Sequence, residues 1–308
     1  MKTILATTST FAEGSEALLE SLSASGFRII QNPYKRQLKG KELDDLLEKN
    51  KPLGMLAGTE TISREHIEQA AGHLRVISRV GGGWDNIDRE AAELMGVLVY
   101  RTPGVLTDAV AELTIGLILS GLRYIPYHDR MIRQGKWQKK MGGLLRDKVI
   151  GIIGFGAIGQ RVGELVKAFG AEVIYYEPCK VDVIWASPVS LNDLLSGSDI
   201  ISIHAGGKEM ILGPFELEII KKGNVLLVNT ARGNLIDENH LYVLLREGRL
   251  KCACLDVFEH EPYDGSLTHL DNVVVTPHIG SYAREARCLM EQQAVNNLLD
   301  GFKKIGIL

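Results

Sequence analysis

Short apolar runs alternate with amphipathic stretches along the first hundred residues. The runs predicted to be buried strands are Lys2–Thr7, Phe27–Gln31, Gly54–Ala57, Leu74–Ser78 and Val97–Tyr100. Between them, segments such as Glu42–Lys49 and Arg64–Ala71 place apolar residues at helical spacing. Strands that alternate with helices in this way predict a parallel sheet with helices on both faces.

A second run of the same kind follows a helix predicted at about 108–122 and an arm that contains Pro126, Gly135 and Trp137. Its predicted strands are Val149–Gly154, Glu172–Tyr176, Ile200–His204, Val225–Asn229, Cys252–Asp256 and Val273–Thr276, and a last helix is predicted at Ala283–Phe302. We therefore predict an α/β fold with two parallel-sheet domains. Residues 1–102 with 281–308 form a flavodoxin-like domain, and residues 103–280 form a Rossmann-like domain. Ligands of such sheets bind at the carboxyl ends of the strands, so the active site is expected in a cleft between the domains.

Charge and hydropathy exclude two classes of partner. The formal net charge is −3, which gives no large positive field for nucleic acid or for an anionic membrane. No apolar run approaches the ~20 residues that span a bilayer, and Met1–Leu5 gives way to polar residues too early for a signal peptide. The expected location is the cytoplasm, with neither a nucleic-acid nor a membrane partner.

The cysteines do not form a recognisable framework. Four cysteines are too few for a disulfide scaffold in 308 residues, and Cys252 and Cys254 have no second pair at zinc spacing. We expect buried, reduced thiols and no metal site. Glycine is the unusual residue, because 33 of 308 residues exceed the common ~7% without any repeat to absorb them.

A glycine-rich turn marks a dinucleotide site. The strand at Val149 enters Gly154-x-Gly156-x-x-Gly159 and is followed by an amphipathic helix. Gly154 permits a tight turn, Gly156 lets the backbone approach a pyrophosphate, and Gly159 allows close packing of helix on strand, while the helix N-terminus attracts the anion. The motif alone is weak, since glycine turns between strand and helix are common.

The end of the next strand strengthens the assignment. Glu177 follows the glycine turn by about twenty residues, where a carboxylate accepts hydrogen bonds from both hydroxyls of an adenosine ribose. The same carboxylate repels a 2′-phosphate, and Pro178 and Cys179 supply no arginine to attract one. The sequence therefore predicts NAD rather than NADP, with a purely structural turn and a solvated Glu177 as the alternative.

Three later blocks place polar residues beside strand ends: Val228–Gly233, Leu255–Pro262 and Val275–Ser281. Together they contain an arginine, carboxylates and a histidine. A guanidinium pairs with a substrate carboxylate and polarises a carbonyl, while an imidazolium donates a proton as hydride arrives. A carboxylate beside the histidine keeps it protonated near neutral pH. These are the groups needed to reduce a 2-oxo acid.

At this point the chain closely resembles the D-isomer-specific 2-hydroxyacid dehydrogenases. The resemblance runs from about Gly54 to Ser281 and includes Arg79–Asp88, Thr102–Thr107 with Ala111–Thr114, the glycine turn and the three blocks. It implies a triad of Arg232 as the substrate anchor, His278 as the acid/base and Glu261 as its partner. Glu259 is the competing partner, but the family motif places its acid immediately before the proline.

The resemblance also assigns the other site residues. It implies an NAD-binding domain at 103–280 and a substrate domain at 1–102 with 281–308. Arg79, Gly81, Gly82 and Arg232 are expected to bind the substrate carboxylate, with Trp84 packing beside them. Asp256 is expected to hold the nicotinamide amide, with a simple strand cap as the alternative. The residues expected at the cofactor are Gly154, Gly156, Ala157, Ile158, Gly159, Glu177, His204, Thr230, Ala231, Arg232, Asp256, His278 and Gly280. The other six histidines are expected to be solvated.

Two departures from the family pattern limit the substrate assignment. After His204 the usual proline-containing loop is replaced by Ala205–Lys208, and the segment to Gly213 is shorter. The stretch Leu56–Thr59 lacks the arginine that phosphoglycerate dehydrogenases place there, although Arg79, Lys139 and Lys140 remain as substitutes.

The function implied is an NAD-dependent D-2-hydroxyacid dehydrogenase, an oxidoreductase that acts on CH–OH donors with NAD as acceptor. Glyoxylate, hydroxypyruvate and 3-phosphoglycerate stay open as substrates. The alternative is an NAD(H)-sensing, corepressor-like binding protein of the same fold, and the chain's ending close to its last helix favours the enzyme.

The segment Arg123–Trp137 resembles the arm through which family members dimerise, so a homodimer is expected.

Overall fold

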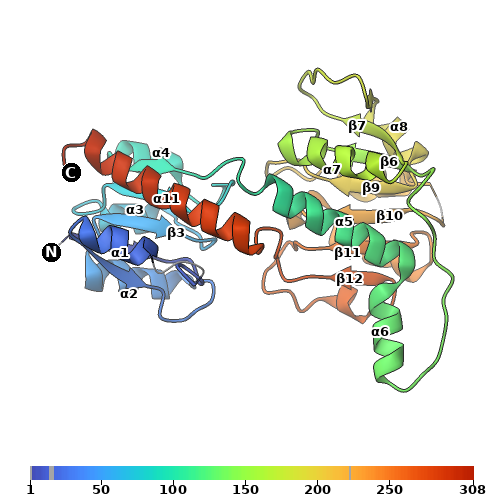
Figure 1. Ribbon diagram of the computed structural model, residues 1–308, viewed down its shortest axis with the longest axis horizontal. Coiled ribbons are helices and arrows are strands. Elements are labelled where there is room, and N and C mark those ends of the chain that lie inside the picture. Colours follow the sequence, from blue (N-terminus) through green and yellow to red (C-terminus); the bar gives the residue numbers. More distant parts are fainter. Residues whose placement is uncertain (1, 14–16, 222) are drawn as a thin grey trace. The chain divides into compact units, whose positions relative to one another are not determined.

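Two units of parallel sheet make up the chain. The computed structural model describes residues 2–13, 17–221 and 223–308 (Figure 1). The first unit consists of Met1–Leu106 with Ser281–Leu308, and the second of Thr107–Gly280. Each unit is described below by itself.

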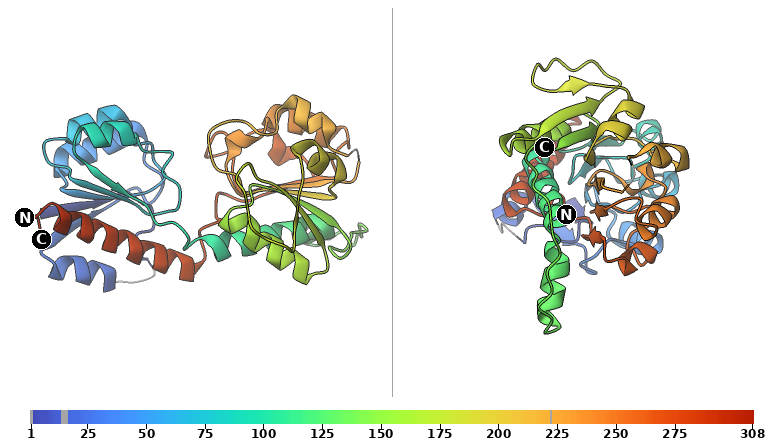
Figure 2. Two further views of the ribbon diagram at one scale, coloured as in Figure 1. Left: turned by 90° about the horizontal axis from the view of Figure 1, so that it is seen from above. Right: turned by 90° about the vertical axis from the view of Figure 1, so that its right-hand side faces the viewer.

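The first unit contains five parallel strands in the order β2-β1-β3-β4-β5. They are β1 (Lys2–Ala6), β2 (Phe27–Gln31), β3 (Gly54–Ala57), β4 (Val76–Arg79) and β5 (Leu98–Tyr100). The helices on one face are α2 (Gly40–Asn50), α3 (Arg64–Ala70) and α4 (Arg89–Leu94), and those on the other are α1 (Ala17–Ala24) and α11 (Arg284–Lys304) (Figure 2). This strand order is the flavodoxin-like one.

Alternation along each strand sends neighbouring side chains to opposite helix layers. In β1, Ile4 packs with the core that includes α1 and α11, whereas Leu5 packs with the core of α2 and α3. The last helix lies very close to the sheet because of two small residues. A Cβ on Gly54 would meet Phe302 at 2.5 Å, and one on Gly301 would meet Val76 at 2.9 Å. The carboxyl-terminal segment is therefore an integral part of the first unit.

The second unit contains seven parallel strands in the order β12-β11-β10-β9-β6-β7-β8. They are β6 (Val149–Ile153), β7 (Glu172–Tyr176), β8 (Ser187–Pro188), β9 (Ile200–Ile203), β10 (Leu226–Asn229), β11 (Cys252–Leu255) and β12 (Val273–Val275). One face carries α5 (Thr107–Arg123) and α7 (Ala157–Ala168), and the other carries α8 (Leu191–Gly197), α9 (Pro214–Ile219) and α10 (Glu238–Arg246). This is the Rossmann order with one further strand. The predicted α/β class with two parallel sheets is confirmed.

A helix that the sequence pattern did not predict follows α5. The arm begins with α6 (Ile125–Arg133), which projects away from its sheet and has no buried residue (Figure 1). Farther along the arm, Trp137 and Met141 are 82% and 93% exposed. No single helix in residues 2–13, 17–221 and 223–308 is long and apolar enough to cross a membrane. Only α5 and α6 taken together have the required length and apolar character, and they are bent by 63° relative to each other.

Candidate active site

The glycine turn has the geometry that a dinucleotide needs. Gly154 has φ +86°, which favours glycine, and Gly156 is the N-cap of α7. A Cβ on Gly159 would lie 2.1 Å from the carbonyl oxygen of Gly154, so helix and turn touch directly. Beside Gly156 a Cβ would meet no atom within 4 Å. The turn therefore leaves open space at the N-terminus of a twelve-residue helix.

Glu177 is fixed beside that turn by backbone amides. The Phe155 N–H donates to Glu177 Oε2 at 2.9 Å, and the Cys179 N–H donates to Oε1 at 3.2 Å. The carboxylate thus points back to the residue between the first two glycines. Each oxygen still has a lone pair for a further donor.

His204 lies at the carboxyl end of β9, next to the same turn. A Cβ on Gly154 would meet the His204 carbonyl carbon at 2.6 Å, so the two backbones are in contact. Its Nε2 is 2.8 Å from Ser202 Oγ, while its Nδ1 is buried without a hydrogen-bond partner among the described residues. Burial lowers the pKa of His204 to about 3, so the ring is neutral at physiological pH. A buried, unpartnered nitrogen at this position fits a ligand that supplies the missing partner.

The turn after β10 is shaped by Asn229. Its Oδ1 accepts from the Ala231 N–H at 3.0 Å and its Nδ2 donates to the Arg232 carbonyl at 2.8 Å. Thr230 is anchored on α5, since its Oγ1 lies 3.0 Å from Thr114 Oγ1. These contacts present the backbone of Thr230 and Ala231 just beyond the strand, and the Arg232 guanidinium donates back to the Ala231 carbonyl at 2.7 Å.

Asp256 organises the loop that carries His278. Its Oδ1 accepts from Thr276 Oγ1 at 2.6 Å and from the Ile279 N–H at 2.8 Å, and its Oδ2 accepts from the Gly280 N–H at 2.8 Å. Burial raises the pKa of Asp256 above its ordinary value, against the effect of these bonds. A single carboxylate therefore ties the ends of β11 and β12 together, and Oδ2 has capacity for one more donor.

His278 and Glu261 form a hydrogen-bonded pair. His278 Nδ1 is 2.8 Å from Glu261 Oε2, and the side chains are 40% and 31% exposed. Burial by itself would raise the pKa of Glu261, but the hydrogen bond and charge of His278, the Phe258 N–H and the charge of Arg232 lower it below its ordinary value. Glu261 is thus an anionic partner that leaves Nε2 of the histidine for a substrate.

In the first unit the residues expected at the substrate also meet at a strand end. The Arg79 guanidinium lies against the next turn: a Cβ on Gly81 would be 1.2 Å from its Nη1. Thr102 Oγ1 accepts from the Gly81 N–H at 2.9 Å, and the Arg101 guanidinium donates to the Gly82 carbonyl at 3.1 Å. The guanidinium groups of Arg89 and Arg101 lie 4.4 and 4.5 Å from the Trp84 ring centroid. The turn is therefore held from several sides.

Taken together, the strand ends of the second unit suit a dinucleotide. The turn has open space where a pyrophosphate lies, Glu177 has acceptor capacity for a ribose, and His204 Nδ1 lacks a partner. An acid/base pair and an arginine follow on the neighbouring strands. Among the described residues no group of three or more His, Cys, Asp or Glu side chains is placed to hold a metal ion.

The family is decided by comparison with known proteins. The profile of the D-isomer specific 2-hydroxyacid dehydrogenase NAD-binding domain matches residues 115–280, the segment that carries this constellation. The chain belongs to the D-isomer specific 2-hydroxyacid dehydrogenases. It is therefore an oxidoreductase of that family.

Several relatives match most of this chain. A glyoxylate reductase of Thermococcus litoralis is 38% identical over 305 residues, which cover 92% of each chain. A D-3-phosphoglycerate dehydrogenase of Methanocaldococcus jannaschii is 41% identical over 262 residues, which cover 80% of this chain and 49% of the longer relative. In the solved structures, an acyclic imino acid reductase in complex with NADPH and D-Arg has a TM-score of 0.86 at 28% identity and covers 98% of this chain and 97% of its own.

Two expectations about the dehydrogenase are wrong in detail. His66 was expected at the surface, but it is 9% exposed, with Nδ1 bound to the Ser63 N–H and Nε2 facing Asp44. Cys179 was expected to be a buried thiol and is exposed. The role of Asp256 at the nicotinamide amide stays a prediction; in the structure its carboxylate accepts from three donors of the His278 loop.

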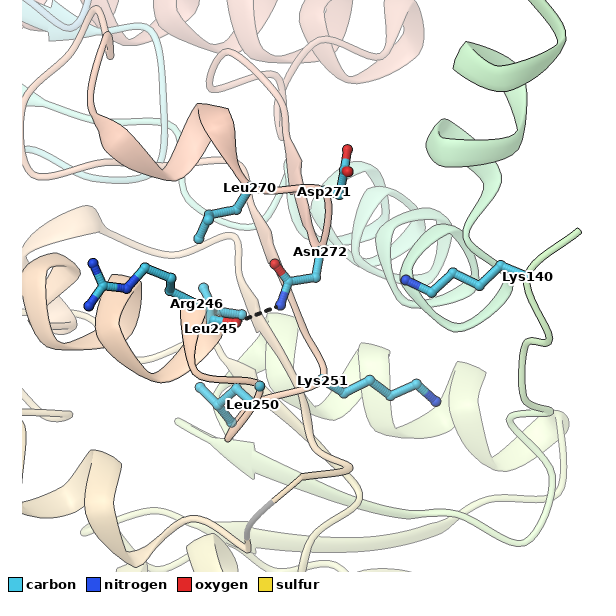
Figure 3. Close-up of a pocket in the computed structure, with 9 residues that line it drawn as sticks. Lys140, Leu245, Arg246, Leu250, Lys251, Leu270, Asp271 and Asn272 are labelled. Atoms are coloured by element: carbon cyan, nitrogen blue, oxygen red, sulfur yellow. Dashed lines mark hydrogen bonds between the residues drawn. The ribbon is translucent and has the colours of Figure 1, made fainter. Parts of the chain in front are cut away.

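A separate cavity of about 430 Å³ lies at the other edge of the second sheet (Figure 3). Lys251 and Asn272, which line it, precede β11 and β12, whereas the triad residues follow the strands. Asn272 Nδ2 donates to the Leu245 carbonyl at 3.1 Å, and Arg246 points away from Lys140 and Lys251 in the picture. The cationic side chains that line the cavity do not converge, so the cavity gives no sign of an anion site.

Proposed function

We propose that this protein is an NAD-dependent D-2-hydroxyacid dehydrogenase that reduces a small 2-oxo acid, with glyoxylate first and hydroxypyruvate second as substrates. The observation that carries the proposal is the His278–Glu261 pair at 2.8 Å on the strand edge that also holds Arg232 and the glycine turn. A glyoxylate reductase that matches 92% of this chain along 92% of its own length supports a substrate of that size.

In the proposed mechanism, bound NADH supplies the hydride. Arg232 pairs with the substrate carboxylate and polarises the carbonyl, while Arg79 and the Gly82 amide bind the carboxylate as well. The Gly81 N–H, which was expected to do the same, donates to Thr102 Oγ1 instead. His278 donates a proton from Nε2 to the carbonyl oxygen as negative charge develops there. Glu261 stays ionised, holds the ring through Nδ1 and stabilises its protonated form. In the oxidative direction the same imidazole accepts the proton from the hydroxyl.

The cofactor residues are proposed as the geometry supports them. The amides at the start of α7, from Gly156, Ala157, Ile158 and Gly159, would face the pyrophosphate, and Glu177 the adenosine ribose. Gly154 would contribute through the shape of the turn, because its N–H donates to the Tyr176 carbonyl at 2.9 Å. Thr230, Ala231 and Gly280 would line the nicotinamide side, His204 would supply its buried nitrogen, and Asp256 Oδ2 would accept from the carboxamide.

Turnover of purified protein tests the activity. NADH with glyoxylate, hydroxypyruvate and 3-phosphohydroxypyruvate is expected to give turnover with at least the first, read as loss of NADH absorbance. Failure with every small 2-oxo acid, with NADH and NADPH alike, would contradict the enzyme and leave the NAD(H)-sensing binding protein as the better interpretation.

NAD is proposed over NADP because Glu177 is anionic and fixed. Loss of its charged hydrogen bonds costs roughly 1.5–3 kcal/mol, so Glu177→Ala with Pro178→Arg is expected to lower the kcat/KM ratio of NADH to NADPH by about tenfold or more. Cofactor preference that stays the same in this double variant would refute the assignment. A related structure of the same fold is in complex with NADPH, so the fold by itself does not exclude that cofactor.

A homodimer is proposed from the exposed arm. Ile125 and Ile132 of α6 are more than half exposed, and Trp137 and Met141 continue the apolar surface along the arm. Light scattering on a size-exclusion column is expected to give twice the chain mass, and Trp137→Ser with Met141→Ser to weaken the association. A wild-type mass of one chain would contradict the dimer.

A further inference from the structure

Glu238 contacts the turn that carries Glu261. The mechanism proposed above gives Glu238 no role. It is the first residue of α10, and its Oε1 accepts from the Glu259 N–H at 2.7 Å. In the same turn the Phe258 N–H donates to Glu261 Oε1 at 3.1 Å. Two consecutive amides thus donate to two different carboxylates, one of which is the partner of His278.

The turn is also pressed against the segment that carries Arg232. A Cβ on Gly233 would lie 1.8 Å from the Phe258 carbonyl carbon and 2.3 Å from the Glu259 nitrogen. From Gly233 the chain continues through a short 3₁₀ helix, Gly233–Leu235, into α10, where Glu238 reaches back to the same peptide. One face of the peptide is therefore fixed by Gly233 and its N–H by Glu238.

The bond is not needed to form α10. The N-cap Asp237 accepts from the His240 N–H at 2.9 Å, and this bond satisfies the start of the helix without Glu238. The Glu238 side chain instead accepts its hydrogen bond from another segment, the turn that contains Glu259. Burial and the charges of Glu259 and Glu261 raise the pKa of Glu238, while the Glu259 N–H and the His260 charge oppose this.

We propose that Glu238 is a positioning residue, which holds the Phe258–Glu261 turn against Gly233 so that the Glu261 carboxylate stays within hydrogen-bond distance of His278. It acts through the turn and touches neither substrate nor cofactor. Its negative charge also adds to that of Glu261 at the imidazolium. The other charged groups near Glu238, Glu261 and His278 are Glu259, His260, Asp256 and Arg232. The inference rests on the proposed function, because it assigns His278 the proton transfer.

Two substitutions separate the hydrogen bond from the charge. Glu238→Gln keeps an acceptor for the Glu259 N–H and removes the charge, whereas Glu238→Ala removes both. For Glu238→Ala we expect kcat to fall about tenfold with NADH affinity unchanged, since a misplaced general acid loses part of its ~10²–10⁴-fold contribution. For Glu238→Gln we expect kcat close to wild type and the fall of the reductive rate at high pH to begin at lower pH. Glu247→Gln and Glu247→Ala, at the exposed far end of α10, serve as matched controls without effect.

A spectroscopic readout keeps the inference separate from the proposed function. The ring protons of His278, assigned by comparison with His278→Asn, are titrated by NMR in wild type and in Glu238→Gln, and the variant is expected to titrate at lower pH. Unchanged titration in Glu238→Gln together with unchanged kcat in folded Glu238→Ala would overturn the role of Glu238. If the wild type reduces no 2-oxo acid, the proposed function fails, and the NMR titration still decides the electrostatic coupling.

Discussion

The two units each contain a carboxylate paired with a basic side chain, and the pairs differ in what else surrounds them. In the second unit His278 and Glu261 are 40% and 31% exposed, and Nε2 of the histidine is the proposed proton donor. In the first unit Arg287 and Glu291 of α11 are 15% and 4% exposed. There the guanidinium also donates to Thr10 Oγ1 at 3.0 Å, and the carboxylate accepts from the Ala12 N–H at 2.9 Å.

The comparison indicates that burial determines whether an ion pair contributes to stability or to proton transfer. The buried pair has its hydrogen-bonding capacity taken up by the loop after β1, so removing one partner leaves an uncompensated charge inside the protein. The half-exposed pair can gain or lose a proton at modest cost, because water screens the change. We therefore expect the first pair to govern stability and the second to govern turnover.

His278→Asn gives the largest expected effect. The general acid is lost, so kcat for 2-oxo acid reduction is expected to fall by about 10²–10⁴-fold, while the free energy of unfolding changes little. Steady-state turnover and a urea titration measure the two. Turnover within a few-fold of wild type would show that another group donates the proton.

Glu291→Gln is expected to reverse the pattern. Arg287 stays buried without its counter-charge, which costs about 3–5 kcal/mol of unfolding free energy, whereas kcat of the folded fraction changes little. Urea unfolding followed by circular dichroism checks this. Replacing both residues by leucine is expected to cost less than the single change, and a larger loss in the double variant would contradict the explanation.

Glu261→Gln has a smaller effect on turnover than the loss of His278. The imidazolium loses its anionic partner, so kcat is expected to fall roughly tenfold and the high-pH fall of the reductive rate to begin at lower pH. A pH profile of kcat/KM detects the change. Glu259→Gln provides the control, because Glu261 and not Glu259 is the proposed partner of His278. If the pH profile shifted equally in Glu259→Gln, the choice between the two acids would be reopened.

An exposed pair gives the smallest effect and completes the series. The hydrogen bond from Arg36, helped by the Lys39 N–H, lowers the pKa of Glu42 to about 2. A lowered folded-state pKa stabilises the fold above the ordinary glutamate pKa, and this contribution is lost as pH falls toward 2. The urea midpoint of wild type is expected to exceed that of Glu42→Gln slightly at pH 6, and the gap to close under acidic conditions. A constant gap would mean that the charge is not responsible.

The sequence pattern predicts the interior strands well because they are continuous apolar runs. β2, β3 and β7 have the predicted bounds, and β9, β11 and β12 end one residue earlier than predicted, before the polar residues His204, Asp256 and Thr276. The edge strand β8 has only Ser187 and Pro188 and no apolar run to reveal it. The helix α6 is hidden by Pro126, although proline is well tolerated in a first turn.

The site is predicted less evenly, because spacing reveals residues in motifs but not contacts between them. Asn229 could have been recognised, since an asparagine at a strand end commonly accepts from the amide two residues on. Nothing local indicates that Glu238 reaches Glu259, twenty-one residues away, or that Asp256 holds both ends of the His278 loop. These depend on which strands become neighbours in the folded sheet.

The bond from the Phe155 amide to Glu177 has a consequence for how cofactor preference can change in evolution. Glu177, the residue proposed to select the cofactor, also helps to hold the glycine turn in shape. A single replacement that admits a 2′-phosphate would therefore loosen the site for any dinucleotide, and lineages that switch must first acquire another acceptor for that amide. Preference for one cofactor is in this way protected by the architecture of the turn, and a change of preference is expected to need at least two substitutions.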